Sequence, residues 1–169
     1  GDAVIANAIE GAGGADTISV LGNASVASVN GAGAGSDGSA AADAGNTILV
    51  NTTGTVGTVL GGDQADAITL TAGTVGSVAM GNGSDALVVS AATYDGSQVL
   101  DGGDDLSSAD GMVDTLTLKN LTVAATGAKI LNMENVVIDG GRVSFSDNAL
   151  TTGSDAGTGL SIVNGGALD

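Results

Sequence analysis

The segment GGDQADAITL, residues 61–70, joins a glycine-rich turn to a strand-like run, and its second half recurs along the 169-residue chain. In DAITL (66–70) an acidic residue and a spacer precede aliphatic residues at alternate positions, the period of a strand with one buried face. The same pattern is found at DTISV (16–20), NTILV (46–50), DALVV (85–89), DTLTL (114–118), ENVVI (134–138) and, in weaker form, TGLSI (158–162). The chain is therefore built from repeats.

The repeats have a regular length of 19 or 20 residues, as the starts at residues 46, 66 and 85 show. The two longer intervals contain small polar insertions, at 32–42 and 104–112. One such unit cannot bury its apolar face alone, and like strands that stack in register form parallel sheets. We therefore predict an all-β fold, a right-handed parallel β-helix (β-solenoid) of about seven coils, with residues 1–169 as a single domain segment.

Aligning the repeats predicts two buried ladders of aliphatic side chains. The first ladder contains Ile18, Ile48, Ile68, Leu87, Leu116 and Val136, and the second contains Val20, Val50, Leu70, Val89, Leu118 and Ile138. The pairs of valines three apart in SVASV (25–29), TVGTV (55–59) and TVGSV (74–78) break the alternation and predict a bend between two short strands. Only residues 125–135 could hold a helical turn, and that spacing also suits a loop followed by a strand.

The two insertions both precede the acidic or amide residue that starts a strand, so we expect them to leave the solenoid at the same corner. They are either tolerated surface loops or protruding recognition loops. Their residues are mostly Gly, Ala, Ser and Asp, with hardly any of the Trp, Tyr or Arg anchors that dominate protein recognition.

The composition excludes several classes of function. A net charge of −16 argues against nucleic acid and anionic membranes as ligands, and no apolar run is long enough for direct membrane insertion. The chain has no Cys and no His, while Tyr94, Lys119, Lys129 and Arg142 are scattered, so the aspartates lack the partners that catalysis on sugars requires. We predict that the protein is not an enzyme and that it is extracellular.

The glycine and aspartate pattern is close to the calcium nonapeptide G-G-x-G-x-D-x-U-x, in which U is a large aliphatic residue. The segments GAGGADTIS (11–19), GGDQADAIT (61–69) and MGNGSDALV (80–88) each lack one glycine. Calcium is therefore possible but not required, and its candidate ligands are Asp66, Asp85, Asp101, Asp104 and Asp105. The alternative is that each aspartate caps its own turn by accepting main-chain N–H groups, as in an Asx-turn.

The C-terminal part of the chain resembles the passenger domains of bacterial autotransporters. Such passengers contain a Gly-Gly-Asp turn, a DTLTL strand, an xNxENVxI strand, a GGxVxF strand and a closing GxGLxIxNGGxL. The matching positions are 114–118, 132–138, 140–145 and 159–168, whereas residues 1–95 match only in the style of the repeat. The resemblance implies a segment of a longer cell-surface adhesin or virulence factor whose leader and membrane barrel lie outside this sequence.

Other classes of secreted repeat protein remain open. One is a calcium-binding segment of an RTX-like adhesin or surface-layer protein, and another is a self-assembling or ice-binding solenoid with a threonine ladder. Thr17, Thr47 and Thr115 align, but Ala67 and Ala86 interrupt that ladder. The expected partner is a host-cell or matrix component, or another copy of the chain.

Overall fold

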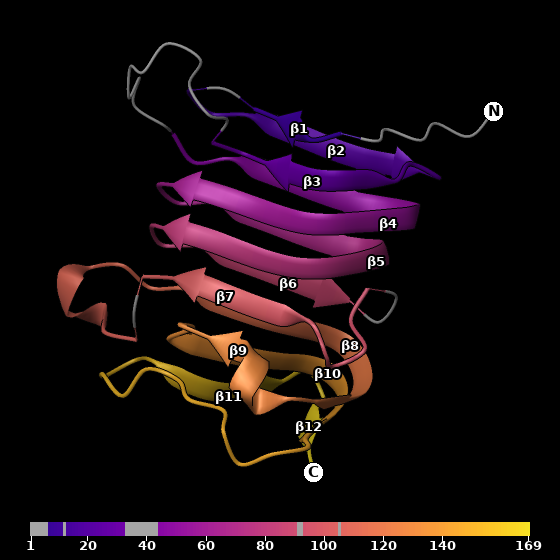
Figure 1. Ribbon diagram of the computed structural model, residues 1–169. Helices are drawn as coiled ribbons and strands as arrows, with labels where there is room; N and C mark the ends of the chain where they lie inside the picture. The colour runs from indigo at the N-terminus through magenta and orange to yellow at the C-terminus, as the bar shows by residue number, and fades with distance from the viewer. Residues whose placement is uncertain (1–6, 12, 33–43, 91–92, 105) are drawn as a thin grey trace.

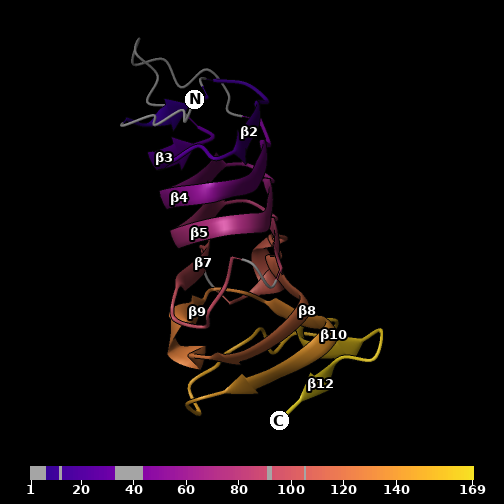
Figure 2. The same ribbon diagram turned by 90° about the vertical axis from the view of Figure 1, so that its right-hand side faces the viewer.

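The computed structural model describes residues 7–11, 13–32, 44–90, 93–104 and 106–169. This part of the chain is nearly all β, and its strands join in one large parallel sheet, which is compatible with the predicted β-solenoid. Figure 1 shows the strands stacked one beneath another from the N-terminal to the C-terminal end, and Figure 2 shows the same stack from the side.

The strands follow the repeats. They are β1 (Ile9–Glu10), β2 (Thr17–Gly22), β3 (Val26–Asn30), β4 (Thr47–Asp63), β5 (Ala67–Asn82), β6 (Ala86–Ser90), β7 (Val99–Gly103), β8 (Thr115–Ala125), β9 (Ile130–Leu131), β10 (Asn135–Phe145), β11 (Gly159–Val163) and β12 (Ala167–Leu168). Two short 3-10 helices, η1 (Ser108–Asp110) and η2 (Gly127–Lys129), lie between them, and the described residues contain no α-helix. No helix in this part of the chain is long and apolar enough to cross a membrane.

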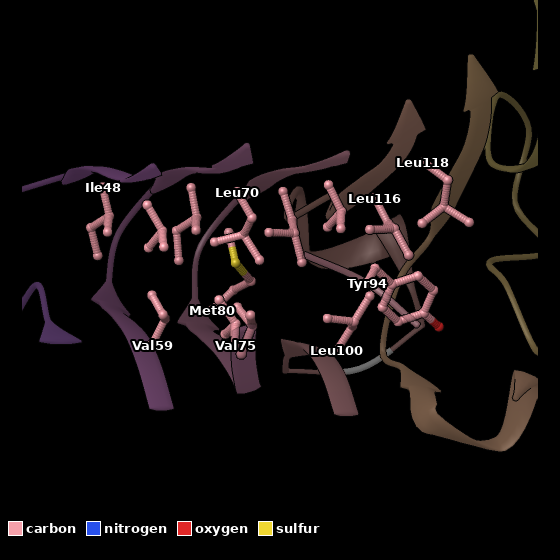
Figure 3. Close-up of a cluster of buried hydrophobic side chains, with 14 of the residues drawn as sticks. Ile48, Val59, Leu70, Val75, Met80, Tyr94, Leu100, Leu116 and Leu118 are labelled. Carbon is pink, nitrogen blue, oxygen red and sulfur yellow. The ribbon is translucent and has the colours of Figure 1, made fainter. Parts of the chain in front are cut away.

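Both predicted ladders are present. Parallel pairing aligns Ile18 with Ile48, Ile48 with Ile68, Ile68 with Leu87, Leu87 with Leu116 and Leu116 with Val136, and the second ladder keeps the same register two residues later. All twelve side chains are at most 8% exposed. Figure 3 shows members of both ladders facing Val59, Val75 and Met80 across the core. The core is therefore a stack of like aliphatic residues.

The predicted bend is present, but the strand does not end there. Val56 and Val59 are both buried although three residues separate them along the chain, as the sequence suggested. Instead of two short strands, β4 continues past these two valines in constant register with β5, and the shift of register lies earlier, between Val50 and Thr55. A bulge at that earlier place lets the chain turn while most of its main-chain groups stay paired with the neighbouring unit.

The residues that lead into the two insertions lie at the same corner. Asn30, Leu60, Ala79 and Asp101 lie at one register position, so Gly31 and Gly102 lie at equivalent places shortly before the two insertions. Residues 33–42 of the first insertion lie outside the described residues. The second insertion contains η1, where the main-chain N–H and the hydroxyl of Ser108 donate to Asp155 Oδ2 at 2.9 and 3.0 Å.

The segment 125–135 combines the two alternatives that its sequence allowed. Gly127–Lys129 form the single turn η2, and β9 follows directly and pairs with β7. Asp147, on a later loop, accepts the N–H groups of Gly127 at 2.7 Å and Ala128 at 3.1 Å, which fixes the start of the turn.

Replacing Ile68 with Asp tests the ladders. The side chain of Ile68 is 0% exposed, so the variant would bury a carboxylate among aliphatic residues and should lose more than about 4 kcal/mol of unfolding free energy. Ala67→Asp is the matched control, because Ala67 lies next to Ile68 but on the exposed face, and it should cost at most about 1 kcal/mol. Urea unfolding followed by circular dichroism measures both, and equal effects would contradict the register.

Candidate functional site: a buried ladder of acidic side chains

The acidic or amide residue that starts each repeat points into the core. Asp66 precedes Ile68 and Leu70 at the same period of two, so all three side chains lie on the inner face of the strand. We call the equivalent residues the acid ladder: Asp16, Asn46, Asp66, Asp85, Asp114 and Glu134. The last five are at most 2% exposed, which is unusual for charged groups.

Each of the first five residues of the acid ladder donates its main-chain N–H to the side chain of the next. Asp16 N donates to Asn46 Oδ1, Asn46 N to Asp66 Oδ1, Asp66 N to Asp85 Oδ1, Asp85 N to Asp114 Oδ1 and Asp114 N to Glu134 Oε2, over distances of 2.6–2.9 Å. A net intramolecular hydrogen bond contributes about 0.5–1.5 kcal/mol, and more where the acceptor is charged. The ladder therefore links neighbouring repeats beside the sheet.

The predicted Asx-turns were assigned to the wrong partner at Asp66 and Asp85. These side chains accept N–H groups from the preceding repeat, 19 or 20 residues away. The reason is that inward-facing side chains reach the stacked neighbour, whereas an Asx-turn needs a side chain that lies over its own loop. True Asx geometry occurs at the exposed Asp95, which accepts from Ser97, and at Asp110, which accepts from Met112.

A glycine lies against the second oxygen of several of these carboxyl groups. A Cβ atom added to Gly61 would lie 2.5 Å from Asp66 Oδ2, and one added to Gly102 would lie 2.6 Å from Asp114 Oδ2. Both imagined atoms would also collide with a main-chain carbonyl of the next repeat. The spacing from glycine to aspartate that resembles a calcium loop thus has a packing reason in this fold.

Two members of the ladder have strongly perturbed acidity. Burial raises the pKa of Asp114 to about 7, and repulsion from Asp85, Glu134 and Asp104 adds to the increase. Burial likewise raises the pKa of Asp85 to about 6, with Asp66 and Asp104 as its acidic neighbours. The N–H groups that these carboxyl groups accept favour the charged form, but they do not offset the loss of water.

The structure places the predicted calcium ligands in different surroundings. Asp66 and Asp85 belong to the acid ladder, while Asp101 lies in β7 and accepts a hydrogen bond from Asn132 Nδ2 at 2.9 Å. Asp104 follows β7 and has a buried Oδ2, and Asp105 lies outside the described residues. Within the described ranges no three carboxyl-bearing residues are arranged to hold a metal ion. Calcium at these residues stays a prediction.

Sequence reasoning missed that the aspartates are buried, although a signal was present. The aspartates lie an even number of residues before the aliphatic ladder residues, and this spacing alone places them on the inner face of the strand.

Sequence reasoning also missed a series of outer contacts in which an asparagine amide donates to an aspartate of the preceding repeat. These contacts are Asn82 with Asp63, Asn132 with Asp101 and Asn164 with Asp139.

Two of the basic residues lie beside carboxylates. Lys119 Nζ lies 3.9 Å from Asp139 Oδ2, and Arg142 Nη1 lies 2.7 Å from Asp169 Oδ2. The side chains of Lys119 and Arg142 are exposed. A shallow hollow near the C-terminal end is lined by Phe145, Asp147, Asn148, Leu150, Leu168 and Asp169.

The sequence matches no protein-family model, and no curated protein and no solved structure matches it either.

Gln64 occupies the corner where the calcium pattern places its third glycine, and its backbone is strained. Its φ is +90°, in the region that Gly14 and Gly83 occupy at the equivalent corners. Replacing Gln64 with Gly should raise the unfolding free energy by about 0.5 to 1 kcal/mol, because relief of the strain exceeds the entropy that glycine loses. Thermal melts in EDTA measure the gain without calcium.

Gln64→Ala is the control for that prediction, because alanine keeps the Cβ atom and therefore the strain. It should leave the melting temperature nearly unchanged. A gain for Gln64→Gly that appears only when calcium is added would show instead that the third glycine completes a metal loop.

Proposed function

We propose that the chain is a structural display segment of a secreted bacterial cell-surface protein, of the kind found in the autotransporter passengers that it resembles. In this proposal it is a right-handed parallel β-helix of about seven coils that holds loops at a fixed distance from the cell. It acts by position rather than by catalysis. The observation that carries the proposal is the unbroken register of the two aliphatic ladders from Ile18 to Ile138.

Such a register supports a stiff rod. Each repeat is held to the next by parallel main-chain pairing, by the aliphatic ladders and by the acid ladder, and all three run along the stack. Bending the rod would separate strands on one side and break several of these contacts together. Repeat proteins of this type are stabilised by contacts between neighbours, so length can be added without a new core.

The insertions support a display role because the corner is complete without them. Four residues separate Gly61 from Asp66 and Met80 from Asp85, whereas eleven separate Gly102 from Asp114. Contacts outside the core hold the extra chain in place. Ser84 Oγ accepts the N–H of Val113, and the N–H of Ser108 donates to Asp155 Oδ2. The second insertion is thus an addition to a finished repeat, presented in a defined orientation.

The chemistry of the described surface suits a spacer. Lys119 and Arg142 pair with carboxylates, and the chain has an excess of negative charge that favours solubility. The partner that we propose is a host-cell or matrix component reached by the insertions, or a second copy of the chain.

One observation favours the alternative of a calcium-binding repeat segment. Asp85, Asp104 and Asp114 each bury an oxygen that accepts no hydrogen bond. If calcium filled this region in solution, removing it with EDTA would lower the melting temperature by many degrees and adding it back would restore the value. The display proposal expects little change.

Shortening the insertions tests the display proposal. Deleting residues 33–42 leaves four residues between Gly31 and Asn46, and replacing 104–112 with Asn-Gly copies the corner between Met80 and Asp85. Both variants should melt within a few degrees of the parent chain, because the ladders remain intact. Binding of the labelled parent and variants to host cells and to matrix-coated surfaces is then compared.

Loss of binding in a variant that still folds would support display by that insertion. Parent-like binding by both variants would contradict it and place recognition on a coil face. Unfolding of either variant would show that its insertion clamps the core, and would also contradict display by that loop.

A further inference from the structure

The turn between the last two strands contains an Asn-Gly pair that lies at the surface. Three residues, 164–166, separate β11 from β12, whereas two residues, 140–141, occupy the equivalent place in β10. The turn with the extra residue projects outward, and Figure 2 shows the chain leaving the stack just before β12. Asn164 and Gly165 are both exposed, with φ angles of +50° and +75°.

The chain has two other Asn-Gly pairs, at 30–31 and 82–83, and their glycines are packed against adjacent repeats. A Cβ atom added to Gly31 or to Gly83 would lie 2.4 Å from a main-chain carbonyl oxygen of the adjacent repeat. A Cβ atom added to Gly165 would meet no atom within 4 Å. The main chain therefore has room to move at Gly165, whereas the stack confines it at the other two pairs.

An asparagine followed by glycine is open to loss of its side-chain amide, because glycine has no Cβ atom to hinder ring closure. The main-chain nitrogen of the glycine forms a bond to the asparagine Cγ, the Cγ–Nδ2 bond breaks, and Nδ2 leaves as ammonia with the proton of the glycine nitrogen. Water then opens the cyclic imide at one of its two C–N bonds. Opening at Cγ gives aspartate, and opening at the other carbonyl gives isoaspartate, whose main chain runs through Cγ.

The side chain of Asn164 links the last two repeats. Its Nδ2 donates to Asp139 Oδ1 at 2.6 Å, and Asp139 Oδ2 lies 3.9 Å from Lys119 Nζ. Loss of the amide replaces this donor with a carboxylate oxygen, so two groups of like charge then face each other. Because the contact is exposed, the repulsion alone is weak. Isoaspartate is more disruptive, because it adds a main-chain atom to a turn that both neighbouring strands hold at its ends.

We propose that Asn164–Gly165 is a site of spontaneous deamidation, and that the isoaspartate formed there releases β12 from β10. The water that opens the imide comes from solvent, to which the turn is exposed. The release is confined to the C-terminal end, since only Ala167 and Leu168 pair with β10 after the turn, while the pairs between β11 and β10 precede it. This inference is independent of what the rod displays.

Deamidation rates of the intact chain at pH 8, in buffer and in concentrated urea, test the site. Mass spectrometry of peptide fragments locates each replacement of NH2 by OH, and trypsin, which cleaves after Arg142, places Asn164 in the peptide 143–169. In the folded chain Asn164 should convert at least about tenfold faster than Asn30 or Asn82, because those two pairs react only when repeats open. In urea the three rates should be alike.

The two solvents make the test decisive. Equal rates at all three pairs in the folded chain would contradict the proposal, because packing would then give the other two pairs no protection. A preference for Asn164 that stays unchanged in urea would contradict it as well, since the local sequence and not the fold would then be responsible.

Amide hydrogen exchange tests the release of β12. The isoaspartyl form is separated by chromatography after incubation, and its Asp169 N–H, which donates to the carbonyl of Val143 at 3.0 Å, should exchange faster than in fresh protein. Asn164→Asp is the matched control, because it introduces the charge without the additional main-chain atom, and its Asp169 N–H should exchange as in the parent. Slow exchange in the isoaspartyl form, or equally fast exchange in the control, would overturn this part of the proposal.

Discussion

In-register stacking of like residues is the constraint on which the rest of this structure depends. A strand such as β5 buries Ile68 only because Ile48 lies on one side of it and Leu87 on the other. Each repeat alone has one apolar edge and no core, so the free energy of folding resides in the contacts between repeats. The same constraint explains the scarcity of aromatic residues, since aliphatic side chains of similar size stack at every level without gaps.

The stacking also determines what the aspartates do. In a single repeat an inward aspartate would be an uncompensated buried charge, but the next repeat supplies an N–H for one of its oxygens. The other oxygen of Asp85 and of Asp114 is buried without a hydrogen-bond partner. At Asn46 an amide takes the same position, and its Nδ2 donates to the carbonyl of Gly61 at 3.4 Å. A pattern that resembles a calcium loop can therefore arise from packing and hydrogen bonding alone.

The sequence predicted the aliphatic ladders residue by residue, because burial of one strand face produces a period of two that needs no knowledge of partners. It did not predict the partners of Asp66 or Asp85, since these depend on which repeat lies beside them. The sequence also could not predict the contact between Ser108 and Asp155, because these residues are 47 positions apart along the chain. The continuity of β4 through its corner was missed because a bulge leaves no composition signal that differs from a turn.

The acid ladder, as a link between stacked repeats, is tested most directly by amide hydrogen exchange of the intact chain, read by NMR. The main-chain N–H groups of Asp66 and Asp85, which donate to carboxyl groups of the next repeat, should exchange as slowly as those of the paired strand β5. The N–H of Ser97 donates to Asp95 within an exposed turn and should exchange rapidly, although its acceptor has the same chemistry. Exchange of Asp66 and Asp85 at the rate of Ser97 would contradict the account.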